Sequence, residues 1–186
     1  EIHASKVMVD NEQSAYEAVK HLLENGCKRI AFLAGPKNVS VSNQRHLGYL
    51  RALAEAGIQV DDSLIIHSDY YQDTATSQTH QLMKSINPPD GILVVSDRLA
   101  LGVLVGLREL KISVPEQVKI VSFNNEPICS IVSPTISSVA QPLEEIGKLV
   151  MKLLLDQIEG RSEIVEPVIE VLKTQLIVRE SSVNVN

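Results

Sequence analysis

Residues 91–110 read GILVVSDRLALGVLVGLREL and decide the fold. The first five, Gly91–Val95, form an uninterrupted apolar run, which is typical of a strand buried on both faces. Ser96 and Asp97 follow, and short polar side chains of this kind cap the first turn of a helix. Apolar residues then recur at helical spacing as far as about Leu110. A buried strand that turns directly into a helix predicts a βα unit of a parallel sheet.

The same rhythm extends outward on both sides of this stretch. We expect further strands at Val7–Val9, Arg29–Ala34, Leu64–His67 and Val118–Phe123. Between them we expect helices. The first ends at Gly26, the next covers about Asn43–Ala56, and a third has apolar residues from Ala75 to Ile86 on one face. Successive βα units predict an α/β protein, a Rossmann-like parallel sheet with helices on both faces.

The rhythm changes in the last third of the chain. Residues 124–138 are rich in Ser, Pro and Asn and predict a loop. Pro142 opens a long helix that Gly160 closes, because proline is tolerated in a helix's first turn. Residues 168–178 predict β structure, and residues 181–186 predict a frayed end.

Composition limits the function classes. The 186 residues carry 17 Lys and Arg against 23 Asp and Glu, a net charge of −6. This excess of acidic residues argues against binding of nucleic acid by this chain, since affinity for the phosphate backbone comes mainly from Lys and Arg. No apolar run reaches the roughly 18 residues of a membrane span. Cys27 and Cys129 are isolated, which favours a reducing compartment over a disulfide framework or a zinc site.

Signatures of catalysis are missing. The sequence has no G-x-S-x-G elbow, no phosphate-binding P-loop and no H-E-x-x-H motif. The five histidines show no metal-ligand spacing, and we interpret them as solvated surface residues. We therefore expect no catalytic residue, no metal and no cofactor. Gly102 and Gly106, inside the predicted helix after Asp97, suggest close packing of that helix on the sheet.

Polar residues follow the predicted strands, where ligands of open parallel sheets bind. They are Asp10, Arg45, the pair Tyr70 and Tyr71, Ser96, Asp97, Asn124 and Asn125. Carboxylates and amides pair with hydroxyl groups, arginine offers a planar fork, and an aromatic face covers the C–H side of a sugar. The rim therefore suits a polyhydroxylated ligand.

Each of these residues also has a purely structural interpretation. Asp10 and Asp97 could serve only as helix caps. Arg45 could be a solvated charge on a helix face, and Tyr70 or Tyr71 could simply cover the core. Residue spacing leaves these alternatives open.

Several ordered motifs resemble the lactose/galactose-repressor (LacI/GalR) family of bacterial transcription regulators. They span nearly the whole chain: Val7–Asn11, Arg29–Phe32 with Gly35-Pro36, Arg45–Tyr49, Ser96-Asp97 with Ala100-x-Gly102, Val114–Glu116, Ile120–Phe123, Gln141-Pro142 and Leu176–Ser181. No single motif is decisive, but the occurrence of all of them in the same order along the chain is specific to the family.

The resemblance implies a periplasmic-binding-protein-like type I core of two Rossmann-like subdomains. Residues 28–141 and 164–182 would form a complete C-terminal, effector-binding subdomain. Residues 1–27 and 142–163 would be part of an N-terminal subdomain. A DNA-binding head would lie outside the sequence given, which fits the acidic balance.

Carried over residue by residue, the resemblance places seven residues along the effector cleft: Asp10, Arg45, Tyr70, Ser96, Asp97, Asn124 and Gln141. Arg45 would make bidentate contacts, and Tyr70 would stack on the ligand. Asn124 stands where an aspartate is common in the family, and Ser96 replaces a frequent asparagine. Lys111 occupies the place of a helix-ending glycine, so a left-handed backbone there would cost roughly 1 kcal/mol.

We therefore expect the effector-sensing and dimerisation core of a cytoplasmic, DNA-binding transcription regulator. It would bind a small ligand, a sugar or a sugar derivative, between its lobes, act as a homodimer on operator DNA, contact no membrane and catalyse no reaction. The alternative is a periplasmic sugar-binding protein of a transporter, which would share the cleft. Sequence upstream of Glu1 would separate the two: a helix-turn-helix for the regulator, a secretory signal for the transporter.

Overall fold

The structure is a computed structural model that describes residues 4–159 and 167–183. Its contacts divide the chain into two units. The larger unit comprises Asn11–Ala140 and Leu176–Asn186, and the smaller unit comprises Glu1–Asp10 and Gln141–Gln175. The chain thus passes from one unit to the other three times.

A six-stranded sheet forms the centre of the larger unit, in the order β3-β2-β4-β5-β6-β8. Its strands are β2 (Ile30–Ala34), β3 (Ile65–His67), β4 (Gly91–Val94), β5 (Lys119–Asn124), β6 (Ser137–Ala140) and β8 (Gln175–Ile177). The pairs from β3 to β6 are parallel. This confirms the predicted α/β fold with a Rossmann-like sheet.

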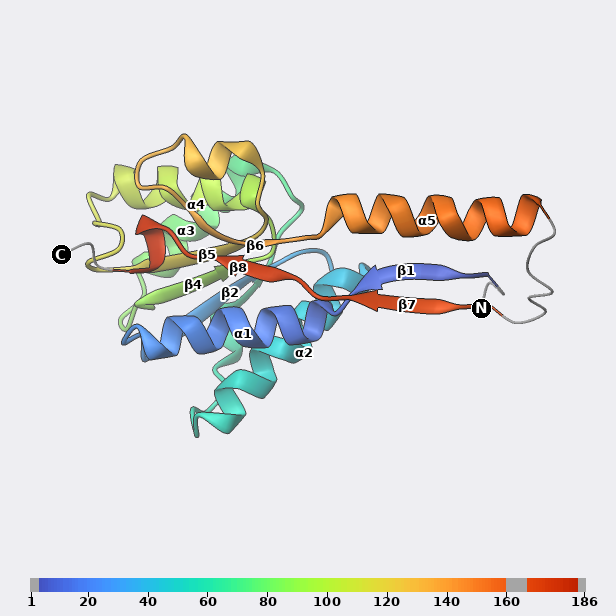
Figure 1. Ribbon diagram of the computed structural model, residues 1–186. Coiled ribbons are helices and arrows are strands. Elements are labelled where there is room, and N and C mark those ends of the chain that lie inside the picture. The colour runs from blue at the N-terminus through green and yellow to red at the C-terminus, as the bar shows by residue number, and fades with distance from the viewer. Residues whose placement is uncertain (1–3, 160–166, 184–186) are drawn as a thin grey trace. The chain divides into compact units, whose positions relative to one another are not determined.

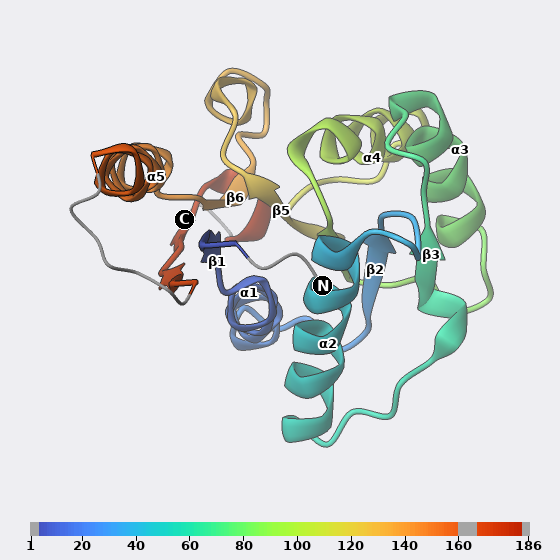
Figure 2. The same cartoon turned by 90° about the vertical axis from the view of Figure 1, so that its right-hand side faces the viewer.

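Helices cover both faces of this sheet. They are α1 (Asn11–Glu24), α2 (Ser40–Glu55), α3 (Gln72–Met83) and α4 (Asp97–Glu109). Figures 1 and 2 show α1 and α2 on one face and α3 and α4 on the other. Because both faces are covered, every residue of β2 and β4 is buried, which explains their uninterrupted apolar sequences.

Close approach of the helices depends on glycine. A Cβ atom at Gly48 of α2 would overlap the backbone oxygen of Glu12 in α1. Cβ atoms at Gly102 and Gly106 of α4 would crowd α3, for example Thr79 at 2.9 Å from a Cβ at Gly106. The expectation that Gly102 and Gly106 pack on the sheet is therefore wrong: the two glycines let α4 pack on α3.

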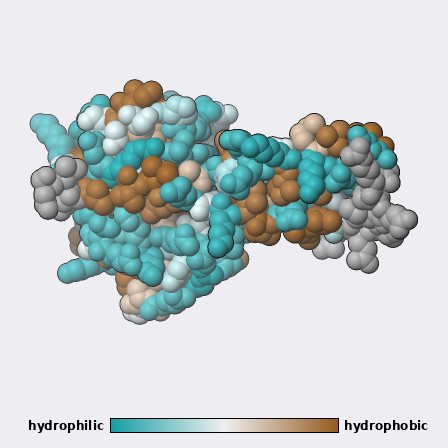
Figure 3. Space-filling model, viewed as in Figure 1, coloured by the Kyte–Doolittle hydropathy of each residue, from teal (hydrophilic) through white to brown (hydrophobic). Residues whose placement is uncertain are grey.

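The smaller unit contains β1 (Lys6–Val9), β7 (Ile169–Leu172) and α5 (Leu143–Ile158). The two strands pair in parallel, with Lys6 opposite Ile169. None of the side chains of α5 is fully buried, and several of its apolar side chains are exposed, among them Val150, Met151 and Leu154. Figure 3 shows hydrophobic residues on the surface of this unit.

Three short 3-10 helices complete the description: η1 (Asp62–Leu64), η2 (Pro127–Ser130) and η3 (Glu180–Ser182). Two of them correct the sequence prediction. The stretch 124–138 is not all loop, because it contains η2 and the first half of β6. Ser181 and Ser182 are not frayed, because both are fully buried.

Other expectations meet the structure in different ways. The helix after Pro142 and the β structure in 168–178 are confirmed, although the latter is two strands. Gly160 and residues 184–186 lie outside the described residues. The implied boundary at residue 27 differs from the division found, which places α1 in the larger unit. Histidines 21, 46, 67 and 80 are all partly buried rather than fully solvated.

Candidate functional site

The strand order reverses at one point of the larger unit. From β2 the chain goes outward to β3, then returns to the other side of β2 as β4 and continues to β5. The connections that leave β2 and β4 therefore lead to helices on opposite faces of the sheet. Such a switch point leaves a crevice at the carboxyl ends of the strands, where ligands bind in open α/β sheets.

Arg45 bridges this switch point. It lies on α2, after β2, and its Nη1 donates a hydrogen bond to the backbone oxygen of Val95, which follows β4. Its Nε donates to Oδ1 of Asn11 at 3.0 Å. The guanidinium carbon lies 3.9 Å from the ring centroid of Phe123 in β5. The side chain is only 4% exposed, so the alternative of a solvated surface charge is wrong.

Burial defines the electrostatics of Arg45. Loss of hydration lowers the pKa of Arg45 to about 10, while charge interactions with Tyr70 and Asp97 oppose that shift. Arg45 forms no ion pair with a carboxylate among the described residues. Its described partners are instead a carbonyl, an amide oxygen and an aromatic ring. The guanidinium is therefore a charged, preformed donor at the switch point.

Tyr70 closes the neighbouring loop. Its backbone is left-handed, with φ of 66°, and its side chain lies against Gly35, where a Cβ atom would overlap the phenol oxygen. The ring is partly buried against the core, so Tyr70 both covers core and stays accessible. The neighbouring Tyr71 is 64% exposed. The left-handed turn therefore separates the two tyrosines into an inner and an outer one.

Ser96 and Asp97 begin α4, but only Ser96 acts as its cap. The Ser96 hydroxyl accepts from the backbone N–H of Leu99 at 3.5 Å. Asp97 is the first helical residue and is fully buried. Its carboxylate accepts hydrogen bonds from the hydroxyls of Ser122 and Ser138 and from the backbone N–H of Glu126. The alternative that Asp97 is only a helix cap is therefore wrong.

Asn124 and Asn125 form a strained turn at the end of β5. Their φ angles are 104° and 54°, and a left-handed backbone costs a residue with a side chain roughly 1–2 kcal/mol. Asn125 is fixed on two sides: its N–H donates to the Ser138 hydroxyl, and its Oδ1 accepts from Nη2 of Arg179 at 2.7 Å. The structure therefore holds the predicted ligand residue Asn124 in a defined turn.

The remaining two predicted residues belong to the smaller unit. The chain leaves the smaller unit after Asp10 and enters it again at Gln141, next in sequence to Asn11 and Ala140. The structure thus brings together five of the seven predicted residues at one edge of the larger unit, namely Arg45, Tyr70, Ser96, Asp97 and Asn124. Ligand contact by any of the seven stays a prediction.

Sequence reasoning missed the residues that support this edge. Asn11, Ser122, Ser138 and Arg179 hold Arg45, Asp97 and Asn125 in place. Arg179 lies within the motif Leu176–Ser181, but no local sequence feature indicates that its side chain contacts Asn125. Ser122 lay within a predicted strand, but its partner Asp97 is 25 positions away, and Ser138 lay in a stretch that was expected to be a loop.

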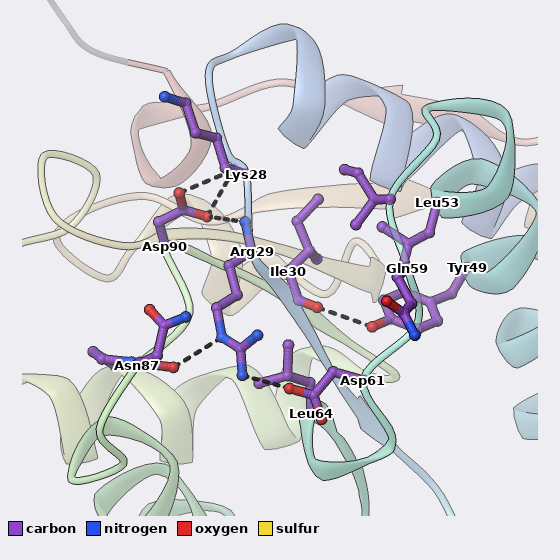
Figure 4. A pocket seen from close by; sticks show the side chains of 12 residues that line it. Lys28, Arg29, Ile30, Tyr49, Leu53, Gln59, Asp61, Leu64, Asn87 and Asp90 are labelled. Carbon is purple, nitrogen blue, oxygen red and sulfur yellow. Dashed lines mark hydrogen bonds and ion pairs between the residues drawn. The ribbon is translucent and has the colours of Figure 1, made fainter.

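A cavity of about 430 Å³ lies at the opposite, amino ends of β2 and β4 (Figure 4). Arg29 pairs with Asp61 at 2.6 Å there and donates to the backbone oxygen of Asn87. Asp90 accepts from the backbone N–H groups of Lys28 and Arg29. These charged groups hold one another in place at the amino ends of the strands, whereas ligands of open α/β sheets bind at the carboxyl ends, where Arg45 lies.

The described residues contain no group of three or more His, Cys, Asp or Glu that could hold a metal ion. In the same part of the chain, no helix is long and apolar enough to span a membrane. Cys27 and Cys129 are both buried free thiols, and burial raises the pKa of each to about 12.

Comparison with known proteins identifies the family. The pattern of the periplasmic binding protein-like domain family matches residues 19–182. Catabolite control protein A of Priestia megaterium is 36% identical over 149 residues, which are 80% of this chain and 45% of that protein. The transcriptional regulator CelR of Thermobifida fusca is 35% identical over 181 residues, 97% of this chain and 53% of that protein.

Solved structures agree with the sequence comparisons. A CelR–cellobiose complex matches with a TM-score of 0.89 and 34% identity over 96% of this chain and 54% of that one. A LacI-family regulatory protein from Chloroflexus aggregans matches with a TM-score of 0.88 and 29% identity over 95% and 63%.

The chain spans about half the length of the curated relatives it matches. Those relatives are named as regulators, among them the transcriptional repressor CytR of Escherichia coli (strain K12), 35% identical over 87% of this chain and 47% of that protein. This chain belongs to the periplasmic binding protein-like domain family, and its homologues are LacI-family transcription regulators.

Proposed function

We propose that this chain is the effector-sensing core of a bacterial transcription regulator. It binds a small polyhydroxylated ligand, a sugar or a sugar derivative, at the carboxyl edge of its larger sheet. The observation that carries the proposal is Arg45, a charged and preformed donor buried at the switch point of the sheet. A planar guanidinium of this kind suits adjacent ligand hydroxyls or a carboxylate.

Four residues of the larger unit contact the ligand in this proposal: Arg45, Tyr70, Ser96 and Asn124. Tyr70 covers an apolar ligand face, and Ser96 and Asn124 exchange hydrogen bonds with hydroxyl groups. Asp10 and Gln141 are the ligand residues proposed for the smaller unit. Asp97 enters the site in a different way, through the turn that it holds.

Ligand binding then shifts a conformational equilibrium of the regulator. In the whole regulator this shift controls a pair of DNA-binding heads, in a cytoplasmic homodimer, on a palindromic operator. The chain itself catalyses no reaction. The relatives are named as regulators, one of them in complex with cellobiose, which supports this reading over a periplasmic transport protein.

A thermal-shift screen tests the proposal. Because the chain has no Trp, unfolding is followed by circular dichroism or an external dye. Cellobiose, ribose, other mono- and disaccharides and their phosphate esters are the probes. A ligand at 100 times its dissociation constant should stabilise the chain by about 2.7 kcal/mol.

Matched variants on the same helix locate the site. Arg45→Met should abolish the ligand-induced shift. Arg51→Met should retain it, because Arg51 faces α1, where it pairs with Glu12 and stacks on Tyr16. Binding that survives both Arg45→Met and Asn124→Ala would contradict the proposed site.

A further inference from the structure

We propose that Asp97 is a positioning residue: it fixes the turn Asn124–Glu126, whose first two residues have a left-handed backbone, and thereby aims Asn124, without itself contacting the ligand. This inference rests on the proposed function in one respect only, that Asn124 faces the ligand. The turn and its hydrogen bonds are properties of the larger unit alone.

The carboxylate of Asp97 reaches the turn by two routes. Directly, its Oδ2 accepts from the backbone N–H of Glu126 at 2.7 Å. Indirectly, its Oδ1 accepts from the Ser138 hydroxyl at 2.7 Å, and that hydroxyl in turn accepts from the backbone N–H of Asn125 at 3.0 Å. Two successive amides of the turn therefore depend on one side chain of α4.

The donor set explains why an aspartate occupies this position. Two hydroxyls and one N–H donate to Asp97, the Cys129 thiol is also hydrogen-bonded to it, and a carboxylate accepts at both oxygens without donating. Asp97 is fully buried and forms no ion pair with any described residue, so these hydrogen bonds, together with the charge interaction with Arg45, compensate its charge. A buried carboxylate that already accepts from Ser122, Ser138 and Glu126 has little left for a ligand.

The far side of the turn has its own support. Nη2 of Arg179 donates to Oδ1 of Asn125, and Nη1 donates to the backbone oxygen of Ile136 at 2.8 Å. Arg179 thus holds the Asn125 side chain, while Asp97 holds the backbone on either side of it. Neither support requires a ligand.

Hydrogen exchange measured by NMR on the ligand-free chain tests this role. In Asp97→Asn, an amide nitrogen that only donates replaces one acceptor oxygen, so three donors compete for the remaining one. We expect the exchange rates of the Asn125 and Glu126 amides to rise about tenfold or more, relative to core amides such as those of Phe32 and Leu93. A loss of overall stability would raise all these rates together.

Asp90→Asn is the matched control. Asp90 also accepts from backbone N–H groups, those of Lys28 and Arg29, but at the amino ends of the strands. It should leave the exchange of residues 125 and 126 unchanged relative to the core. Equal exchange at residues 125 and 126 in both variants, or an increase no larger than that of the core amides, would overturn the proposal.

Ser138→Ala provides the test if Asp97→Asn does not fold. It retains the buried carboxylate but removes the acceptor of the Asn125 N–H, so exchange at Asn125 should rise while Glu126 stays protected. Unchanged protection at Asn125 would overturn the proposal. Failure of cellobiose, ribose and the other probes to bind would instead contradict the proposed function, since the exchange experiment contains no ligand.

Discussion

The guanidinium of Arg45 lies over the ring of Phe123, 3.9 Å from guanidinium carbon to ring centroid. This contact joins α2 to β5, while the hydrogen bond from Arg45 to the Val95 oxygen joins α2 to the end of β4. One buried side chain therefore links three segments at the edge where the ligand is proposed to bind. Its structural and ligand-binding roles can be separated by experiment.

Replacement of Arg45 by Met should lower the free energy of unfolding by about 2–4 kcal/mol, because the buried Val95 and Asn11 oxygens lose their charged donor. Arg51→Met should cost less than about 1 kcal/mol, since the Arg51 pair with Glu12 is partly exposed. Urea unfolding followed by circular dichroism measures both. Equal losses in the two variants would contradict the structural role assigned to Arg45.

Two glycine substitutions should have opposite effects. Gly48→Ala should destabilise the chain by about 3 kcal/mol, because its Cβ would overlap the backbone of α1. Gly147→Ala should stabilise it by about 0.5–1 kcal/mol, since Gly147 lies inside α5 with no atom within 4 Å of the added Cβ. Melting temperatures of the two variants against the parent chain give the signs, and a stable Gly48→Ala variant would refute the close α1–α2 contact.

Lys111→Gly should stabilise the chain by about 1 kcal/mol. Lys111 is exposed, has φ of 58° and follows the end of α4, a place where glycine avoids the cost of a left-handed backbone. Gly57→Ala is the mirror control, because Gly57 has φ of 69° and open space around it, and it should cost about as much as Lys111→Gly gains. Chemical denaturation compares the two, and a loss of stability in Lys111→Gly would contradict the strain.

Stability should fall as the pH drops below 6.5. Burial lowers the pKa of His21 below its ordinary value of 6.5, an effect that Glu24 partly opposes. Between 6.5 and the lower folded pKa, the unfolded chain binds a proton that the folded chain does not, so the free energy of unfolding decreases with acid. The urea midpoint of the parent chain should therefore shift downward from pH 7.5 to 5.5.

His21→Gln should reduce this slope. Burial also lowers the pKa of His46, so His46 should supply the remainder, and the stability of the double variant with His46→Gln should depend little on pH in this range. An unchanged slope in the double variant would exclude the two histidines as the source of the pH dependence.

Asp61 should affect stability in a separate, more acidic range. Hydrogen bonds from Ser63, then from Arg29, lower its pKa from 3.8 to about 2, so its contribution to stability is lost only below about pH 4.

Local sequence predicted most of the fold because local signals were strong. The apolar runs at Ile30–Ala34 and Gly91–Val94 are typical of buried strands, and Gly26 and Gly57 mark helix ends with φ of 91° and 69°. β6 was missed because Ser137 and Ser138 face a polar network rather than an apolar core. Hydroxyl groups whose partners are distant in sequence carry no periodic signal.

Only part of the candidate site could be predicted from local sequence. Arg45 and Asn124 could be identified as candidate ligand residues because they follow strands, and parallel strands bring their carboxyl ends together. The sequence did not predict that Arg45 is buried. Nor did it predict that Asp97 accepts hydrogen bonds from Ser122, Ser138 and Glu126. Such roles depend on hydrogen bonds across 25–41 positions of sequence.

The return of residues 176–182 to the larger unit has a consequence for the timing of folding during synthesis. The fully buried Ser181 donates to the Ile120 oxygen and accepts from the Ser137 N–H, so β5 and β6 are not fully hydrogen-bonded until this segment arrives. The 35 residues Gln141–Gln175 separate it from Ala140. At about 5–20 residues per second, translation takes ~2–7 s to cross that interval. During that time the nascent chain lacks the hydrogen bonds that residues 176–182 make with β5 and β6. The larger unit, which carries Arg45 and Asn124, is therefore completed only after these residues have been synthesised.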